Sequence, residues 1–174
     1  MRKQTLPVTL LCAIAIGIAV FSAGCAIPIS LPEGVESQIP DGANRIDIIT
    51  DQSVDELFAS VQEWLTAQGY STETANDVSR TIDTNSADIG QRTSMKIRLR
   101  INPYERGSKL EAIGSWSSDV EEATFASASD GVSSEEIDWW PAMWQGSDRA
   151  SYAYAKLVSA FHDMPAKEKR YIKQ

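Results

Sequence analysis

The stretch TSMKIRLRINPYERGSKLEAIGSW, residues 93–116, contains two runs in which apolar and polar side chains alternate. The apolar positions of the two runs are Met95, Ile97, Leu99, Ile101, Leu110, Ala112, Gly114 and Trp116. A period of two predicts β-strands with one buried face and one wet face. Because the residues NPYERGS between the runs favour a turn, we expect an antiparallel hairpin at the centre of the fold.

One helix is predicted on each side of this hairpin. Ser53 and Glu56 have the spacing of a capping box, and apolar side chains recur at helical spacing over residues 54–65. Ser147 or Asp148 is the expected cap of the second helix, which again carries a single apolar stripe. Each helix therefore has one face that must be buried.

Shorter strands complete the predicted fold. Residues 45–50 alternate in character, and residues 70–74 and 80–84 are also typical of short strands. The expected order β-α-β-β-β-β-α predicts a two-layer α+β domain over residues 44–164. In it, a mostly antiparallel sheet of about four to five strands packs against two helices. Residues 165–174 are expected to form a polar, basic tail.

The N-terminus is typical of a secretory signal peptide. Arg2 and Lys3 precede an apolar run over residues 6–23, and small residues follow it. This order predicts a signal peptide over residues 1–24. An uncleaved membrane anchor is the alternative, because the run has about the minimum length for a spanning helix. The small residues at its end favour cleavage.

The stretch VFSAGC, residues 20–25, resembles the lipobox of bacterial lipoprotein signal peptides. Ala23, Gly24 and Cys25 match that pattern, while Ser22 occupies a position where the family usually carries leucine. The resemblance implies cleavage before Cys25, followed by attachment of a diacylglyceryl group and an N-acyl chain to this residue. Two or three acyl chains anchor a protein stably in a membrane.

The surroundings of Cys25 bear on its role and on the membrane. A buried or disulfide-bonded thiol is the alternative to lipidation, but the other cysteine, Cys12, lies within the predicted leader. Residues 25–43 are rich in proline and glycine and are expected to be a tether between lipid and domain. Since Ala26 is not the aspartate that retains lipoproteins at the inner membrane, the resemblance implies the outer membrane.

Composition excludes several classes of function. A formal net charge of −8 argues against nucleic acid or a bare anionic lipid surface as the partner. His162 is the single histidine, so zinc sites built from histidine and cysteine are not expected. Phosphate-binding glycine loops and nucleophile elbows are also missing from the sequence. We therefore expect a protein without enzymatic activity, metal or cofactor, although carboxylates distant in sequence could still converge.

The wet face of the hairpin supplies the first candidate binding surface. Arg92, Lys96, Arg98 and Arg100 are expected to project from it, opposite the apolar side chains. One interpretation is a docking stripe for an acidic partner or a phosphorylated head group. The alternative is a solvated sheet face, on which residues such as Glu111 or Asp83 neutralise part of the charge.

The irregular stretch over residues 117–146 supplies the second candidate binding surface. Between residues 119 and 138 it carries seven acidic side chains and no basic one. Trp139, Trp140 and Trp144 follow closely. They could fold back on the core as a lid, or form an aromatic platform for a protein, a glycan or the membrane interface. The acidic part does not have the spacing of a calcium loop.

These features together favour a cell-envelope lipoprotein without enzymatic activity. It is expected to be anchored in the outer membrane, to face the periplasm and to bind another envelope protein or component. The alternative is a small glycan-binding module or cell-wall hydrolase that uses carboxylates and the tryptophan cluster. The element order and the anchor also resemble the helix-grip accessory lipoproteins of the outer-membrane barrel-assembly machinery, and no residue role follows from that likeness.

Overall fold

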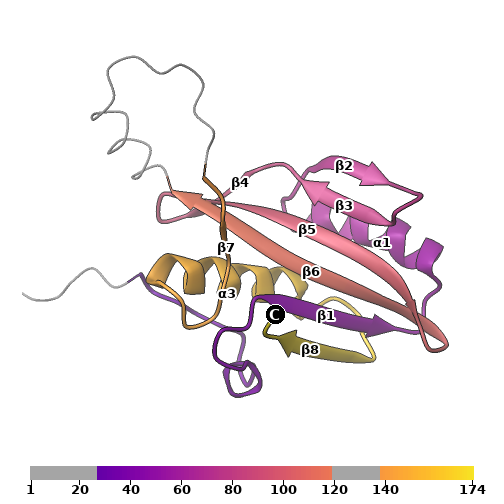
Figure 1. Cartoon of the computed structure of the whole chain (residues 1–174), viewed down its shortest axis with the longest axis horizontal. Helices are drawn as coiled ribbons and strands as arrows, with labels where there is room; N and C mark the ends of the chain where they lie inside the picture. Colours follow the sequence, from indigo (N-terminus) through magenta and orange to yellow (C-terminus); the bar gives the residue numbers. More distant parts are fainter. Residues whose placement is uncertain (1–26, 119–137) are drawn as a thin grey trace, which may run out of the picture.

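The computed structural model describes residues 27–118 and 138–174. In chain order the elements are η2 (Glu36–Gln38), β1 (Arg45–Thr50), α1 (Val54–Ala67), β2 (Thr72–Asn76), β3 (Thr81–Thr84), β4 (Ala87–Gly90), β5 (Thr93–Tyr104), β6 (Gly107–Ser118), β7 (Trp140–Pro141), α3 (Asp148–His162) and β8 (Glu168–Ile172). The α+β class with an antiparallel sheet is therefore confirmed (Figure 1).

The predicted number of strands is wrong, because the sheet has eight strands and not four or five. Three short strands account for the difference. β4 is a four-residue strand, and β7 is a two-residue bridge. β8 forms within residues 165–174, where the sequence led us to expect a polar tail. Strands this short or this charged carry almost no apolar alternation, so only their pairing partners define them.

The β5–β6 hairpin is the centre of the sheet, as predicted. Its pairing runs without interruption from Thr93 opposite Ser118 to Tyr104 opposite Gly107. The sheet order is β2-β3-β5-β6-β1-β8, with β4 also pairing with β5 and β7 with β6. On one side of the hairpin β3 and then β2 follow β5, and on the other side β1 and then β8 follow β6.

The tip of this hairpin lies close against the end of β1. A Cβ atom at Gly107 would lie 2.0 Å from the carbonyl oxygen of Thr50 and 2.9 Å from the Cα atom of Asp51. Both neighbours are backbone atoms and have little freedom to move. Glycine is therefore required at this position for the tip to approach β1.

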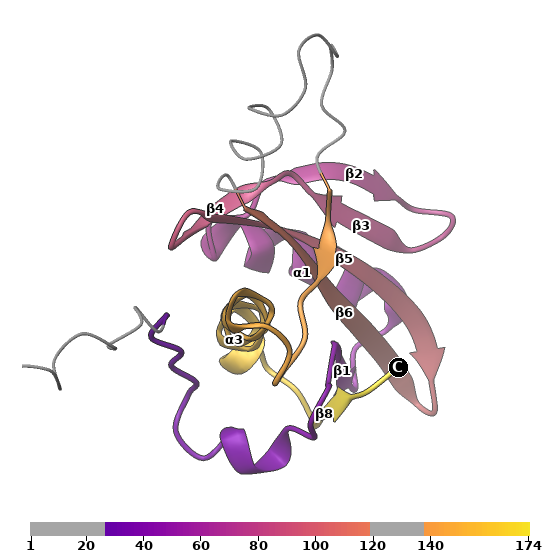
Figure 2. The ribbon, with the colours of Figure 1, turned by 60° about the vertical axis from the view of Figure 1, so that its left-hand side comes forward.

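Both helices lie on the same side of the sheet (Figures 1 and 2). The predicted capping box of α1 is present, because Ser53 Oγ accepts from the Glu56 N–H and Glu56 Oε2 accepts from the Ser53 N–H. Ser147 caps α3. The indole nitrogen of Trp64 donates to the carbonyl oxygen of Ala160 at 2.8 Å, and this bond joins the two helices. Apolar residues of both helices and of one sheet face form a single core.

The segment before β1 packs on the domain. Residues 25–43 were expected to form a tether, whereas Val35, Ile39 and Ala43 are buried in the core. The chain is held there by backbone hydrogen bonds from Gly42 N to Trp144 O and from Trp144 N to Ala43 O. Leu31, Val35 and Ile39 follow one another at intervals of four residues, a weak helical pattern that their proline-rich surroundings conceal.

Candidate functional site

The helices cover one face of the sheet, and the opposite face, here called the outer face, is covered by no element of the described chain (Figure 2). Its side chains come from six strands. They are Arg45, Asp47, Ile49, Glu73, Asp83, Lys96, Arg98, Arg100, Lys109, Glu111, Ile113, Glu168, Arg170 and Ile172. Cations and acids alternate along this face, and their contacts define the candidate site.

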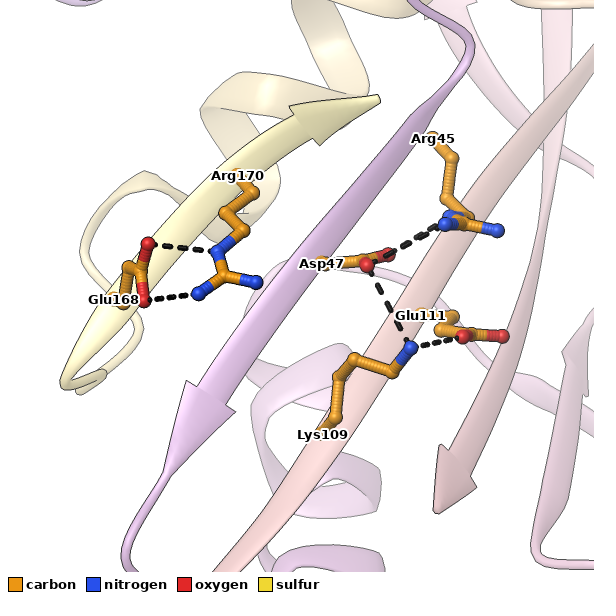
Figure 3. A network of polar contacts seen from close by, with 6 residues as sticks. All are labelled: Arg45, Asp47, Lys109, Glu111, Glu168 and Arg170. Atoms are coloured by element: carbon orange, nitrogen blue, oxygen red, sulfur yellow. Dashed lines mark hydrogen bonds and ion pairs between the residues drawn. The ribbon is translucent and has the colours of Figure 1, made fainter. Parts of the chain in front are cut away.

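An ion network centred on Asp47 occupies the part of the outer face over β1 and β6 (Figure 3). Arg45 Nε lies 2.8 Å from Asp47 Oδ1, and Lys109 Nζ lies 3.7 Å from Asp47 Oδ2. Lys109 Nζ also lies 2.6 Å from Glu111 Oε1. The pairing of β1 with β6 creates the network, since it places Asp47 opposite Glu111 and Ile49 opposite Lys109.

Burial distinguishes this network from an ordinary surface cluster. The Asp47 side chain is only 8% exposed, and those of its partners Arg45 and Lys109 are 19% and 22% exposed. A carboxylate removed from water to this degree must be compensated by nearby cations and hydrogen bonds. The Asp47 network is therefore part of the structure of the sheet, and ion pairs within the protein compensate its charges, although Arg45 Nε and Asp47 Oδ1 lack good hydrogen-bond geometry.

A second ion pair lies beside the network on β8. Arg170 Nε and Nη2 donate to the two carboxylate oxygens of Glu168 at 2.7 and 2.8 Å. These hydrogen bonds lower the pKa of Glu168, and, together with the Tyr104 hydroxyl, they raise the pKa of Arg170. The pair stays fully charged at neutral pH. Since Arg170 is opposite Asp47 in the register, the ionic groups continue across three strands.

The predicted cation stripe is only partly formed. Lys96, Arg98 and Arg100 project from the outer face, whereas Arg92 lies before β5 in the left-handed region, with φ of 53°. Arg98 Nε lies 2.6 Å from Asp83 Oδ1, as the neutralised-face alternative anticipated. Lys96 Nζ lies 3.5 Å from Glu73 Oε2. Arg100 is exposed and is placed opposite Glu111 of β6.

The three predicted tryptophans lie in three different environments. Trp144 is buried in the core beside α3. Trp140 packs against Trp116 at a ring-centroid distance of 5.1 Å with the planes tilted by 40°. Trp139 is half-buried, and Lys96 Nζ lies 5.1 Å from its ring centroid. The rings therefore do not form one exposed platform, and only Trp139 adjoins the cations of the outer face.

Two other predicted features lie outside the described residues. Cys25 precedes them, and the acidic part of the 117–146 stretch falls within residues 119–137. Within the described ranges, no group of three or more histidine, cysteine, aspartate or glutamate side chains could hold a metal ion. No helix in that part of the chain is long and apolar enough to cross a membrane.

An open hollow of about 710 Å³ lies between the start of α1 and the link from α3 to β8. Asp51, Glu56 and Lys167 are on its wall. Glu56 accepts hydrogen bonds from the Ser53 N–H and hydroxyl, which lower the pKa of its carboxyl group. Asp51 is paired with Lys167 at 3.3 Å. A general acid needs a raised pKa, so Glu56 is better suited to the helix cap.

Sequence reasoning missed Asp47 and Lys109 as interacting residues, and it expected Glu111 to neutralise the cation stripe, whereas Glu111 pairs with Lys109. The alternation around Ile46 and Ile48 did place Asp47 on the face opposite the core. Nothing in the sequence indicated that β1 pairs with β6, however, and that pairing creates the network.

No protein-family model matches this chain, and no curated protein matches it.

Proposed function

We propose that the protein is a lipid-anchored lipoprotein of the cell envelope and that it binds another envelope protein through its outer face. The observation that carries this proposal is a complete sheet face that no described element covers, with exposed cations in its middle. Arg98 is 73% exposed, and Arg100 is also exposed. In a chain with a net charge of −8, such a patch favours an acidic partner surface.

The ionic contacts divide the outer face into a rigid part and an adaptable part. The buried Asp47 network fixes the side chains over β1 and β6. Arg98 and Lys96 make exposed ion pairs, and these exchange partners at low cost because exposed pairs contribute little net stability. The groups available to a partner are thus Arg98, Arg100, Lys96 and the neighbouring ring of Trp139.

The N-terminal segment supports a position close to the membrane. Leu31 packs against the core, and the chain from Leu31 back to Cys25 spans at most about 20 Å when fully extended. A lipid on Cys25 would hold the domain near the bilayer surface, nearer than an unpacked tether from residue 25 to 43 would. An outer-membrane position facing the periplasm is part of this proposal and follows from the lipobox resemblance alone.

The anchor is tested by mass spectrometry of the N-terminal peptide from the native membrane. We expect an acylated Cys25 in the wild type, whereas Cys25→Ser leaves an unmodified chain that no longer fractionates with membranes. An unmodified Cys25 in the wild-type protein would contradict the anchor.

The interface is tested by crosslinking in intact cells. The double variant Arg98→Glu/Arg100→Glu should lose a specific crosslinked envelope protein that wild type retains. Arg106→Glu is the matched control, because Arg106 is an exposed arginine in the β5–β6 turn and lies off the outer face. Equal crosslinking by all three proteins would contradict a role for the outer face, whatever the state of Cys25.

A further inference from the structure

β8 is the edge strand of the sheet. The sheet order ends at β8, and no described residue pairs with the edge of β8 that faces away from β1. An edge strand presents a row of N–H and C=O groups that an added strand can satisfy. The opposite edge is less regular, since the pairing of β2 shifts between Thr72 and Thr74. β8 pairs with β1 without a shift from Glu168 to Ile172.

The charge of the β8 edge is opposite to that of the whole chain. Over residues 167–173 the sequence KEKRYIK has four cations and one acid, whereas the chain carries −8. Lys167 and Lys173 are exposed at the two ends of β8, and Arg170 is exposed in the middle. An added strand would meet Lys167 and Lys173 at the ends of the edge and the Arg170–Glu168 pair in its middle. Although Lys167 also pairs with Asp51, this excess of positive charge favours an acidic strand.

The anchoring of β8 gives it the rigidity of a template. The Lys169 ammonium group donates to the carbonyl oxygen of His162 at the C-terminal end of α3. Lys167 N donates to the carbonyl oxygen of Ile49, and Gln174 N donates to the side chain of Asn44. Both ends of the strand are thus fixed to β1 and its flanks, so little ordering entropy remains to be lost when another strand pairs.

We propose that the free edge of β8 binds an acidic protein segment in extended conformation, which adds to the sheet as a further strand. Main-chain hydrogen bonds supply the affinity, and the cations of residues 167–173 select for glutamate or aspartate on the added strand. The main-chain edge of β8 borders the outer face and shares Arg170 with it, whereas Arg98 and Arg100 lie on another strand, and the proposal holds whether or not Cys25 is lipidated. Lysines on an edge strand also prevent two copies of a protein from pairing through that edge. The test separates this role from binding of an acidic segment.

The test uses the full-length chain in detergent and the nine-residue peptide TETETETET as the probe. Amide hydrogen exchange of residues 168–172 is measured with and without the peptide. We expect saturating peptide to slow this exchange about tenfold, because the added strand protects the amides. Raising NaCl from about 0.05 M to about 0.5 M should weaken peptide binding about tenfold, because the charges on the edge are exposed.

Two control peptides and one variant make the result specific. TETETETET with every second amide N-methylated cannot form the ladder and should leave the exchange unchanged. The peptide TKTKTKTKT should bind at least tenfold more weakly, because its charge is repelled. Lys167→Glu/Lys173→Glu should abolish protection by the acidic peptide, whereas Arg92→Glu, at an exposed position just before β5, should not.

Four results would overturn the proposal. They are unchanged exchange of residues 168–172 at saturating acidic peptide, equal protection by the methylated peptide, equal protection by the lysine peptide, and protection that depends on protein concentration without any peptide. The last result would identify a second copy of the chain as the occupant of the edge.

Discussion

The two halves of the outer face carry the same kinds of charged groups in different surroundings. Over β1 and β6, Asp47 lies between Arg45 and Lys109, and all three side chains are largely buried. Over β3 and β5, Arg98 pairs with Asp83 across neighbouring strands, and the arginine is mostly exposed. The nitrogen–oxygen distances of the two pairs are similar, at 2.8 Å for Arg45–Asp47 and 2.6 Å for Arg98–Asp83. Exposure to water, and not this distance alone, therefore decides what an ion pair contributes to stability.

The neighbours of each ion pair explain the difference in burial. The register surrounds Asp47 with Ile49, Ile113 and Ile172 on the same face, and these side chains exclude water. Arg98 lies opposite Ile113 on one side only, and its partner Asp83 lies beside Thr74, close to the β2 edge of the sheet. The interaction is stronger where water is excluded, and an unpaired charge there is also more costly.

The largest expected effect comes from breaking the buried half. Asp47→Ala should lower the free energy of unfolding by about 3 kcal/mol, because it leaves the half-buried Arg45 and Lys109 without their shared acid. Urea unfolding followed by tryptophan fluorescence measures this change. Asp83→Ala is the matched control, with an expected loss below about 1 kcal/mol. Equal losses for both variants would remove the distinction between the halves.

A second prediction concerns the pH dependence of stability that two buried tyrosines, Tyr70 and Tyr154, confer from the helix side of the sheet. Burial raises the pKa of Tyr70, which precedes β2, to about 12. Burial also raises the pKa of Tyr154, whose hydroxyl group donates to the Arg45 carbonyl oxygen. Each tyrosine is neutral when protonated, so the folded state retains a proton that the unfolded chain loses above about pH 10. Stability is therefore complete below pH 10 and decreases as the pH rises.

For Tyr70 the expected loss is about 1.4 kcal/mol for each pH unit between 10 and 12. Urea midpoints measured from pH 8 to pH 12 give the slope. Tyr70→Phe should flatten the slope while changing stability at pH 7 by less than about 1 kcal/mol, since it removes only a hydroxyl group. An unchanged slope in this variant would show that the Tyr70 ring is accessible to solvent.

The smallest expected effect is the coupling energy of the exposed pair. A double-mutant cycle with Arg98→Ala and Asp83→Ala should give less than about 1 kcal/mol, and 1 M NaCl should reduce it further. The same cycle for Lys109 and Glu111, whose charged atoms are 2.6 Å apart and mostly buried, should give a larger value that salt changes less. A larger coupling energy for Arg98 and Asp83 would reverse the comparison.

The features that sequence predicted well are local. Both helices and the capping box follow from contacts between residues three or four positions apart, and the hairpin follows from alternation around one turn. The Asp47 network depends on which distant strands pair, and alternation does not contain that information. The position of Arg92 was missed for a different reason, because its left-handed turn comes just before the strand. The burial of Val35 and Ile39 was concealed by nearby prolines.

The position of β1 has a consequence for how the chain is made. β1 precedes both of its partners in the sequence, and Asn44, just before it, bonds to Gln174, which is 130 residues away. At a synthesis rate of about 5–20 residues per second, β8 leaves the ribosome on the order of ten seconds after β1. β6 is made earlier and can pair with one edge of β1, but the other edge has no partner through that interval. A chain that stops before residue 168 would expose the β1 edge and should be prone to aggregation.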